Sequence, residues 1–548
     1  MLLIQCSKIK KYFGDRLILD IDHLEIYSED RIGIVGRNGI GKTTLMNILS
    51  QRLEPDEGWV KLHGRVGYIS QLESAERKNI SGEMASKFSV EPIWDENMSG
   101  GEKTRFKLGE ALDNNSVIIL ADEPTSNVDM EGIELMAEKF RQYDGALVVI
   151  SHDRSFLDKL CNLILEVEDG KVKIYKGNYS SYREQKIQEN ERALFEYEEY
   201  AKEKKRLEDV INETKQTVKS IRNAPKRMGN SEARLHKMGG QKAKASLEKA
   251  VKNVEKRIEH LEIKKKPKEQ IGIKLDIMDS TRLHSKIIIE GRNINKAFGD
   301  KSIFNNAEFT IYNGSKVALL GPNGSGKTTL IKMITDGEAG IKIAHGAKIG
   351  YFSQDMNILN KNASIIDVVM ESSIYPESFA RLLLARLLFK GDTIYKKVDI
   401  LSGGERVKVS FAFAKILLQD INLLILDEPT NYMDIDALEV IEDTLNEYDR
   451  TLLFVSHDRS FIDAVANQIM TIENKKIELF AGNYTEYLAR NKSSVDHQRE
   501  ELEKQEIVLK NRLSEVIGRL SMPSKKDNIE ELDKEYYEIL DALKGLTS

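Results

Sequence analysis

The stretch GRNGIGKTT at residues 36–44 follows a short apolar run, DRIGIVG at 30–36, and matches the phosphate-loop pattern G-x-x-x-x-G-K-[ST]. An apolar run of this length predicts a buried strand, and the loop after it would lead into a helix. Glycines let backbone N–H groups face phosphate oxygens, and a helix N-terminus adds its dipole. Lys42 would reach the β- and γ-phosphates, and the Thr43 hydroxyl would bind Mg²⁺. The stretch predicts an α/β nucleotide-binding domain.

Two further apolar runs end in chemically active residues. SVIILADEPT at 116–125 ends in two carboxylates, and GALVVISHD at 145–153 delivers His152. Asp122 would position Mg²⁺ through its coordinated water, and Glu123 would act as the general base on the attacking water. A lone histidine at a strand end is usually structural. Its recurrence in the second half of the chain favours a role for His152 as a γ-phosphate sensor.

The same motifs recur in the second half of the chain. GPNGSGKTT lies at 321–329, NLLILDEPT at 422–430 and LLFVSHD at 452–458. The counterparts of the first-half residues are therefore Lys327, Thr328, Asp427, Glu428 and His457. A duplication of this extent indicates tandem domains. Because both copies keep every catalytic position, the sequence predicts two sites competent for hydrolysis.

A third motif indicates the class of protein. MSGGEKTR at 98–105 resembles the signature of ATP-binding-cassette proteins, and LSGGERVK at 401–408 repeats it. That resemblance implies that each signature contacts the γ-phosphate of a nucleotide held by the other cassette. The Lys42 loop would then pair with Ser402, Gly403 and Gly404, and the Lys327 loop with Ser99, Gly100 and Gly101. The resemblance thus implies a monomer with an intramolecular dimer of cassettes.

The resemblance extends to other positions around ATP and Mg²⁺. Gln71 and Gln354 fit the glutamines that help to bind Mg²⁺ in this family. The other predicted Mg²⁺-binding residues are Thr43 and Asp122 in the first site, and Thr328 and Asp427 in the second. Residues 126–129 fit the loop that communicates between the two sites. Phe13 and Phe298 fit the aromatic that stacks on adenine, although a plain core role is an alternative for both. The remaining predicted contacts lie in the phosphate loops: Gly36, Asn38, Gly39, Gly41 and Thr44, and Gly321, Asn323, Gly324, Gly326 and Thr329.

Residues 183–285 resemble neither half. Strong helix formers and apolar residues at helical spacing predict two long antiparallel helices, the first from about 184 to 221. Breaks are expected at Ala224-Pro225, Gly229, Gly239 and Gly240, which leaves a basic tip at 222–245. We therefore expect domains at 1–182 and 286–490, a helical linker between them, and a C-terminal helical extension at 491–548 with a break at Met522-Pro523-Ser524.

Charge separates the linker from the rest of the chain. Residues 201–270 hold 21 Lys and Arg against 10 Asp and Glu, whereas the whole chain has a net charge of −6. A positive rod on an acidic body favours a polyanion partner, and the absence of aromatic residues between Tyr200 and Phe298 favours backbone and shape recognition of folded RNA over base stacking. A solvated coiled coil with surplus lysine is the alternative.

Composition excludes several classes. The two cysteines, Cys6 and Cys161, lack metal-ligand spacing, so no zinc or iron–sulfur site is expected. The first residues lack the apolar core of a secretion signal, and no run of 18 apolar residues occurs. These features fit a cytoplasmic protein without a membrane partner.

Two cassettes joined by a long charged linker resemble the ABC-F family of translation factors. The resemblance implies an ATPase that binds the ribosomal E site and directs its linker toward large-subunit rRNA and the P-site tRNA.

The interval from Gln71 to Ser99 is 20 residues shorter than that from Gln354 to Ser402, whereas housekeeping members usually carry an insertion there. That difference, with the C-terminal extension, resembles the Vga/Lsa/Sal-type antibiotic-resistance branch. A housekeeping factor and a DNA-binding ATPase remain open alternatives. Candidate RNA contacts in the tip are Arg222, Lys226, Arg227, Met228, Arg234, Leu235, His236, Lys237 and Met238.

Overall fold

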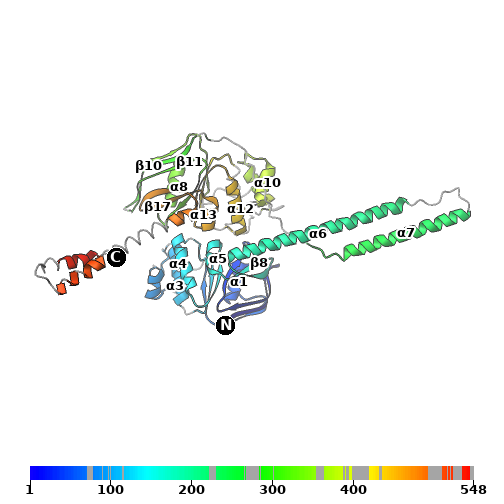
Figure 1. Ribbon diagram of the computed structural model, residues 1–548, viewed down its shortest axis with the longest axis horizontal. Coiled ribbons are helices and arrows are strands. Elements are labelled where there is room, and N and C mark those ends of the chain that lie inside the picture. Colours follow the sequence, from blue (N-terminus) through cyan, green and yellow to red (C-terminus); the bar gives the residue numbers. More distant parts are fainter. Residues whose placement is uncertain are drawn as a thin grey trace.

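The chain folds into two lobes of similar architecture, from which a helical linker and a C-terminal helical segment project (Figure 1). The computed structural model describes residues 1–70, 78–88, 90–96, 98, 100–113, 116–126, 128–220, 230–264, 266, 283, 285–299, 301–352, 363–386, 389, 394–397, 419–430, 433, 435–490, 509–514, 516–518, 520–521 and 534–542. The first lobe contains β1 to β9 and the second contains β10 to β18, which agrees with the predicted α/β fold with tandem domains.

Each lobe contains one six-stranded sheet in which five parallel strands are joined by an antiparallel edge strand. The order is β5-β6-β7-β3-β8-β9 in the first lobe and β14-β15-β16-β12-β17-β18 in the second. The first sheet comprises β3 (Arg31–Val35), β5 (Val66–Ile69), β6 (Ile118–Asp122), β7 (Ala146–Ile150), β8 (Leu163–Glu168) and β9 (Lys171–Lys176). The second comprises β12 (Lys316–Leu320), β14 (Ile349–Phe352), β15 (Leu423–Asp427), β16 (Thr451–Val455), β17 (Gln468–Glu473) and β18 (Lys476–Ala481).

A three-stranded antiparallel sheet completes each lobe, in the order β2-β1-β4 and β11-β10-β13. Its strands are β1 (Leu2–Phe13), β2 (Arg16–Tyr27) and β4 (Glu57–Leu62) in the first lobe, and β10 (Ile287–Phe298), β11 (Lys301–Tyr312) and β13 (Ile341–Ile343) in the second. The helices of the first lobe are α1 (Lys42–Leu49), α2 (Gly82–Phe88), α3 (Gly100–Asp113), α4 (Met130–Arg141) and α5 (Arg154–Leu160). Those of the second are α8 (Lys327–Asp336), α9 (Ile365–Met370), α10 (Glu377–Arg386), α12 (Ile435–Glu447) and α13 (Arg459–Val465).

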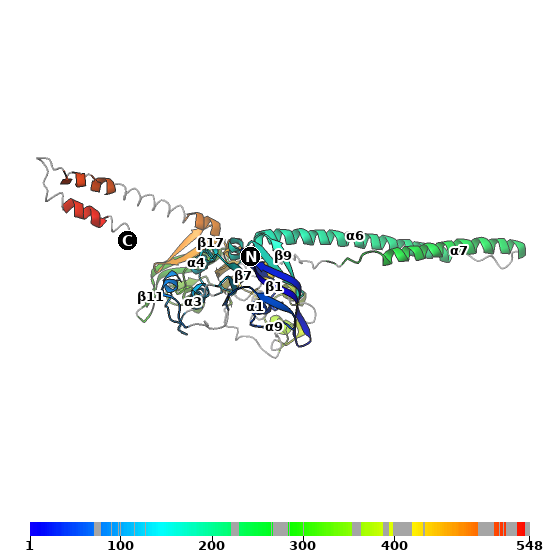
Figure 2. The same ribbon diagram turned by 90° about the horizontal axis from the view of Figure 1, so that it is seen from below.

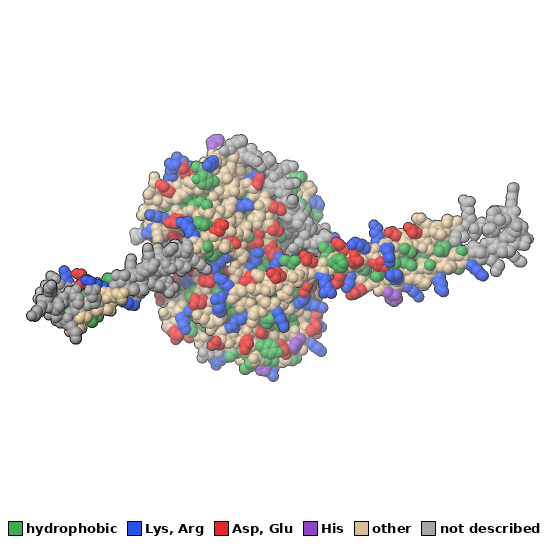
Figure 3. Space-filling view, viewed as in Figure 1, with side chains coloured by type: hydrophobic (Ala, Val, Ile, Leu, Met, Phe, Trp, Pro, Cys, Tyr) green, Lys and Arg blue, Asp and Glu red, His purple; other side chains and the backbone are tan. Residues whose placement is uncertain are grey.

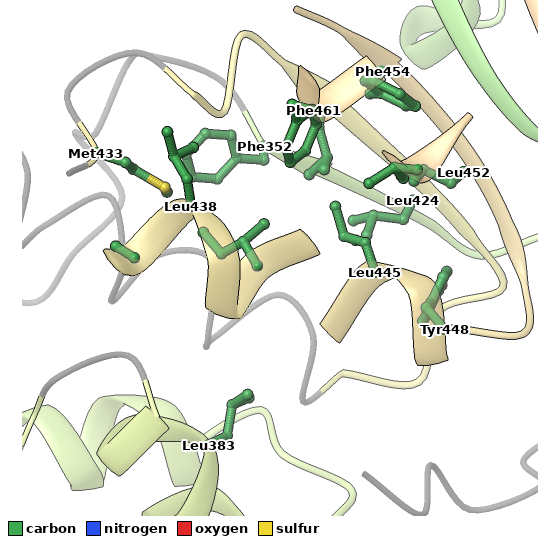
Figure 4. Packing of buried hydrophobic residues seen from close by; sticks show 14 of the residues in the cluster. Phe352, Leu383, Leu424, Met433, Leu438, Leu445, Tyr448, Leu452, Phe454 and Phe461 are labelled. Atoms are coloured by element: carbon green, nitrogen blue, oxygen red, sulfur yellow. The ribbon is translucent and has the colours of Figure 1, made fainter. Parts of the chain in front are cut away.

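The central strands are buried because helices cover one face of each parallel sheet, while a helix and the antiparallel sheet cover the other. Every residue of β6 and of β7 is buried, and so is every residue of β16. In the second lobe, Leu438 and Leu445 of α12 pack with strand residues such as Leu424 and Phe454 (Figure 4). These apolar layers hold the carboxyl ends of the strands, where the predicted motif residues lie, in fixed positions.

The linker consists of two antiparallel helices, α6 (Tyr179–Ser220) and α7 (Asn230–Glu259), as predicted. The helix α6 begins before the predicted residue 184 because Tyr179 and Tyr182 pack into the core of the first lobe. The predicted break at Gly239 and Gly240 is wrong, since α7 continues through both, and residues 230–245 of the predicted tip are helical. The predicted breaks at Ala224-Pro225 and Gly229 lie outside the described residues.

Beyond residue 508, the described residues form two helical pieces, one within 509–521 and one at 534–542. Val516 and Ile539 pack against each other, and Arg512 pairs with Glu535 at 2.7 Å, so the predicted C-terminal helical hairpin is present. The hairpin and the linker project from opposite sides of the two lobes (Figures 1 and 2). Among the described residues, no helix combines the length and the apolar content needed to cross a membrane.

Candidate nucleotide-binding sites

The first phosphate loop connects β3 to α1, and its backbone demands glycine at several points. Gly36, Gly39 and Gly41 have φ values of +145°, +71° and +111°. A Cβ on Gly36 would lie 2.5 Å from the carbonyl oxygen of Val167, and one on Gly41 would lie 2.7 Å from a methyl group of Ile18. Only glycine fits these conformations and these close approaches. The loop thus has the geometry that exposes backbone N–H groups to a bound phosphate.

Lys42 is buried at the first residue of α1 and folds back over the loop. Its Nζ donates to the carbonyl oxygens of Gly36 at 2.6 Å and Arg37 at 3.1 Å. A cavity of about 210 Å³ opens beside it, lined by Phe13, Ile18, Asn38, Gly39, Gly41, Lys42, Thr43 and Thr44. Phe13 is 54% exposed and Phe298 is 59% exposed, so a plain core role for either ring is wrong. Stacking on adenine stays a prediction for both.

The predicted base and sensor of the first site lie together. Asp122 ends β6 and Glu123 follows it, and both side chains are buried. Oε1 of Glu123 lies 2.9 Å from Nε2 of His152, which follows β7. Glu123 has a φ of +51°, a left-handed conformation that is costly for a residue with a Cβ and typical of functional sites. The backbone therefore fixes the carboxylate beside the histidine.

The second site repeats this geometry. Glu428 has a φ of +50°, and its Oε1 lies 3.1 Å from Nε2 of His457. Lys327 donates to the carbonyl oxygen of Gly321 at 2.8 Å. Burial lowers the pKa of Lys327, although Glu428, Asp129 and Asp427 act in the opposite direction. The two sites share this geometry although the sequences around them differ, which indicates that the motif residues themselves determine it.

The carboxylate of Asp427 occupies the position expected of a group that helps to hold Mg²⁺. Burial and the nearby Glu428 raise its pKa, whereas a hydrogen bond with Thr328 opposes that shift. A divalent cation would relieve the cost of keeping this partly buried carboxylate charged. The donor set of a threonine hydroxyl and an aspartate is all oxygen, which suits Mg²⁺. The residues therefore fit ATP with Mg²⁺, which would neutralise charge on the transferred phosphate.

The two lobes face each other across these sites. The backbone N–H of Asn323 in the second phosphate loop donates to Oδ2 of Asp129 at 3.2 Å. Asp129 belongs to the 126–129 loop that was expected to communicate between the sites. Conversely, Nε of Arg37 in the first phosphate loop lies 3.1 Å from Oδ2 of Asp436 on α12. Each phosphate loop thus contacts the opposite lobe within a single chain.

Some predicted residues cannot be placed in this geometry. Gly100 and Gly101 form the start of α3. Gln71, Ser99, Gln354, Ser402, Gly403 and Gly404 lie outside the described residues, as do the tip residues Arg222, Lys226, Arg227 and Met228. Arg234, Leu235, His236, Lys237 and Met238 are part of α7. The pairing of each loop with the opposite signature therefore stays a prediction.

Sequence reasoning missed the ionic contacts between the lobes. Arg154 of α5 makes two hydrogen bonds with Glu442 of α12, and Arg183 of α6 lies 2.7 Å from Glu439. No single motif contains these residues. An alignment of the two halves marks only two of the four, because Arg183 corresponds to Leu488 and Glu442 to Ala137, whereas Arg154 and Glu439 correspond to the identical residue types at Arg459 and Glu134.

Known proteins share this arrangement. A family model described as ABC transporter matches residues 19–126 and 304–431, and a second model with the same description matches 165–242. The ribosome protection protein VmlR of Bacillus subtilis is 31% identical over 99% of this chain and 98% of its own length. The chain belongs to the ABC-F family. The erythromycin resistance ATP-binding protein MsrA of Staphylococcus epidermidis is 32% identical over 86% of this chain and 98% of its own.

This ABC-F protein is an ATPase, in agreement with the two complete sets of motif residues. A solved structure titled RNase-L Inhibitor matches with a TM-score of 0.60 and 19% identity over 89% of this chain and 93% of the other. At that identity the match shows the shared fold alone.

Proposed function

We propose that this ABC-F protein binds the ribosomal E site and uses its linker to protect the large subunit from antibiotics of the peptidyl-transferase centre, with ATP hydrolysis driving release. The observation that carries this proposal is the linker, whose helices α6 and α7 project far beyond the lobes (Figure 1). On the face that the space-filling view shows, Lys and Arg lie along the described part of the linker, with Asp and Glu between them (Figure 3). A projecting cationic rod suits a cleft lined by phosphates.

The comparisons support the antibiotic branch of the proposal. VmlR is named a ribosome protection protein, and MsrA is named for erythromycin resistance. The short interval between Gln71 and Ser99 points in the same direction, because the insertion expected of housekeeping members is absent from the sequence. Residues 1–182 and 286–490 would form the cassettes, and the large-subunit rRNA and the P-site tRNA would be the linker's partners.

The two ATP sites would act as the switch of a cytoplasmic factor. ATP bound between the lobes adds γ-phosphate contacts that ADP lacks, and this difference in affinity favours the closed arrangement. Glu123 and Glu428 would activate the attacking waters, while His152 and His457 would sense the γ-phosphate. Thr43, Asp122 and Gln71, with Thr328, Asp427 and Gln354, would hold Mg²⁺. Hydrolysis would then remove the contacts and permit release.

A ribosome pelleting assay on the Glu123→Gln/Glu428→Gln variant tests the proposal. Removing both bases stops hydrolysis and leaves nucleotide binding intact, so the closed state accumulates. We expect the variant to pellet with 70S or 50S particles when ATP is present and to stay in the supernatant with ADP. The phosphate-loop variant Lys42→Ala/Lys327→Ala should not pellet. Failure of a folded, ATP-bound protein to pellet would contradict ribosome binding, and retention on duplex DNA would favour the DNA-binding alternative.

Substitutions in the predicted tip test whether the protein confers antibiotic resistance or is a housekeeping translation factor. We expect alanine at Met228, Leu235 or Met238 to change drug susceptibility while ATP turnover stays close to that of the parent, because these residues are remote in sequence from both sites. Growth inhibition by peptidyl-transferase-centre antibiotics and phosphate release are the two measurements. Equal loss of both activities would contradict the proposed tip role, and unchanged susceptibility of a host carrying the wild-type protein would favour the housekeeping alternative.

A further inference from the structure

One side of α12 carries three acidic residues, and each contacts an arginine of the first lobe or the linker. Asp436, Glu439 and Glu442 are spaced by three residues and so lie along one side of the helix. Their partners are Arg37 of the first phosphate loop, Arg183 at the base of the linker helix α6, and Arg154 of α5, two residues after His152. We call this set the α12 ladder.

Burial within the α12 ladder increases away from the phosphate loop. The side chains of Arg37 and Asp436 are 45% and 47% exposed, those of Arg183 and Glu439 are 28% and 20% exposed, and those of Arg154 and Glu442 are 13% and 11% exposed. Removing one partner of a buried ion pair is costly, because the other charge stays desolvated. The pair of Arg154 and Glu442 is buried and that of Arg183 and Glu439 is partly buried, so both hold α12 against α5 and the base of α6 while the lobes are together.

Among the described residues, the other side of the molecule lacks this arrangement. The counterpart of α12 is α4, where Glu131, Glu134 and Ala137 replace the three acids. The counterparts of Arg37 and Arg183 are Pro322 and Leu488. Only the remaining arginine is kept, since Arg459 lies 2.7 Å from Glu134. A cavity of about 390 Å³, lined in part by Glu131, Glu134, Pro322 and Leu488, lies where the missing arginines would be.

We propose that the α12 ladder couples closure of the lobes to the direction of the linker, with Arg183 as the positioning residue. When ATP draws the lobes together, α12 moves with the second lobe and meets Arg37, Arg183 and Arg154. Arg183 stands one turn beyond the buried Tyr179, in the part of α6 that still packs on the first lobe, since Lys186 pairs with Glu166 and Glu189 with Lys173 further along the helix. Its contact with Glu439 adds a restraint from the second lobe to these first-lobe contacts, and separation of the lobes removes that restraint.

The α12 ladder makes this coupling one-sided. Because the Arg37 contact belongs to the first phosphate loop, the first ATP site communicates with the linker directly. The second site has Leu488 where Arg183 would be, and the chain beyond it leads to the C-terminal hairpin instead of to the linker.

Distance distributions measured by pulsed electron paramagnetic resonance test this proposal on the full chain. Spin labels would be attached at Asn212→Cys on α6 and Lys342→Cys on β13, both exposed, in the Glu123→Gln/Glu428→Gln background with and without ATP. The native Cys6 and Cys161 are buried, and burial raises the pKa of both thiols, which protects them from labelling. We expect ATP to convert a broad distribution into a narrow one. A distribution that ATP leaves unchanged would overturn the proposal.

Variants at one position identify the positioning residue. Arg183→Leu copies the second half of the chain, and we expect the ratio of narrow to broad populations with ATP to fall about tenfold, equivalent to about 1.4 kcal/mol. Arg183→Lys should retain the narrow population, and so should Arg192→Leu, which removes an exposed arginine of the same helix. Equal nucleotide affinity in all variants reports correct folding. A narrow population in Arg183→Leu, or its loss in Arg183→Lys as well, would overturn the role of this charge.

Discussion

At the scale of single residues, the left-handed backbone at Glu123 and Glu428 is the sharpest sign of function. A carboxylate held 2.9 Å or 3.1 Å from a histidine at the end of a buried strand has little freedom to move. We expect the Glu123→Gln/Glu428→Gln variant to lower ATP turnover by about 10²- to 10⁴-fold, the usual contribution of a positioned base. Phosphate release measures turnover and titration with a fluorescent nucleotide measures binding, which should persist. Glu308→Gln, an exposed carboxylate on β11, should leave both unchanged.

A second residue-scale prediction concerns the caps of α5 and α13. Asp153 and Asp458 accept hydrogen bonds from the backbones of Phe156 and Phe461, and the two carboxylates interact where the lobes meet. Burial and the charge of Asp458 raise the pKa of Asp153 to about 7, and burial also raises the pKa of Asp458. The folded protein then holds protons that the unfolded chain has released above about pH 4, so stability falls as pH rises from about 4 to 7.

Asn at position 153 keeps the capping oxygen and removes the titrating group. We therefore expect Asp153→Asn to flatten the decline of the apparent melting temperature between about pH 4 and pH 7. Thermal unfolding at a series of pH values measures the slope. Asp144→Asn changes an exposed carboxylate near the end of α4 and should retain the parental slope. An unchanged slope in Asp153→Asn would show that this carboxyl does not titrate differently in the folded state.

Residues whose type is dictated by their immediate surroundings, such as a backbone that admits only glycine, were predictable from sequence. Gly36 and Gly41 have backbones that exclude a Cβ, and Asp122 and Glu123 end a strand that is buried throughout. Such requirements leave short, specific patterns in the chain. The pair Arg183 and Glu439 belongs to no such short pattern, because the linker and most of the second lobe separate the two residues along the chain, and they meet only when the lobes are placed together.

At the scale of elements, the pairing of α6 with α7 depends on a small apolar contact. Leu207 and Ile211 of α6 are 4% and 8% exposed, and Val251 of α7 is 7% exposed. We expect Leu207→Ala to weaken the pairing by about 2–5 kcal/mol, the usual cost of emptying a buried leucine site. Hydrogen exchange should then accelerate in both helices, while exchange in β7 and ATP turnover stay unchanged. Val210→Ala, at a position that is 42% exposed, is the matched control and should change exchange little.

The continuity of α7 through Gly239 and Gly240 shows why helix breaks are hard to predict. Each glycine costs about 1 kcal/mol in a helix interior, which is enough to suggest a break when the tip is considered alone. The strong helix formers that follow, Gln241 to Ala245, and the packing of Val251 against α6 outweigh that cost. Propensity is local, whereas the pairing that stabilises α7 comes from residues some forty positions away, as in the contact between Lys215 and Glu255.

At the scale of the whole molecule, the cationic linker should make ribosome binding sensitive to salt. Each phosphate contact contributes about 0.7–0.9 to the slope of log affinity against log salt concentration. We expect Lys242→Gln/Lys249→Gln, two exposed positions of α7, to lower that slope by about 1.4–1.8 if both contact phosphates. Pelleting of the hydrolysis-deficient protein over a range of potassium concentrations measures it. Lys139→Gln/Lys171→Gln in the first lobe should leave the slope unchanged, and equal slopes in all three proteins would argue against linker contacts with phosphate.

Because α6 is long, a small tilt at its base produces a large displacement of its far end. From Arg183 to Ser220 the helix extends about 55 Å at 1.5 Å per residue. A tilt of only about 10° at the base therefore displaces the far end by about 10 Å, which is the width of another helix. A side-chain contact broken or made at Glu439 is thus amplified into a movement comparable in size to a nucleotide, without any change in the linker itself. The movement reaches the far end only if α6 stays straight, so the stiffness of the helix matters to function as much as the residues at the tip.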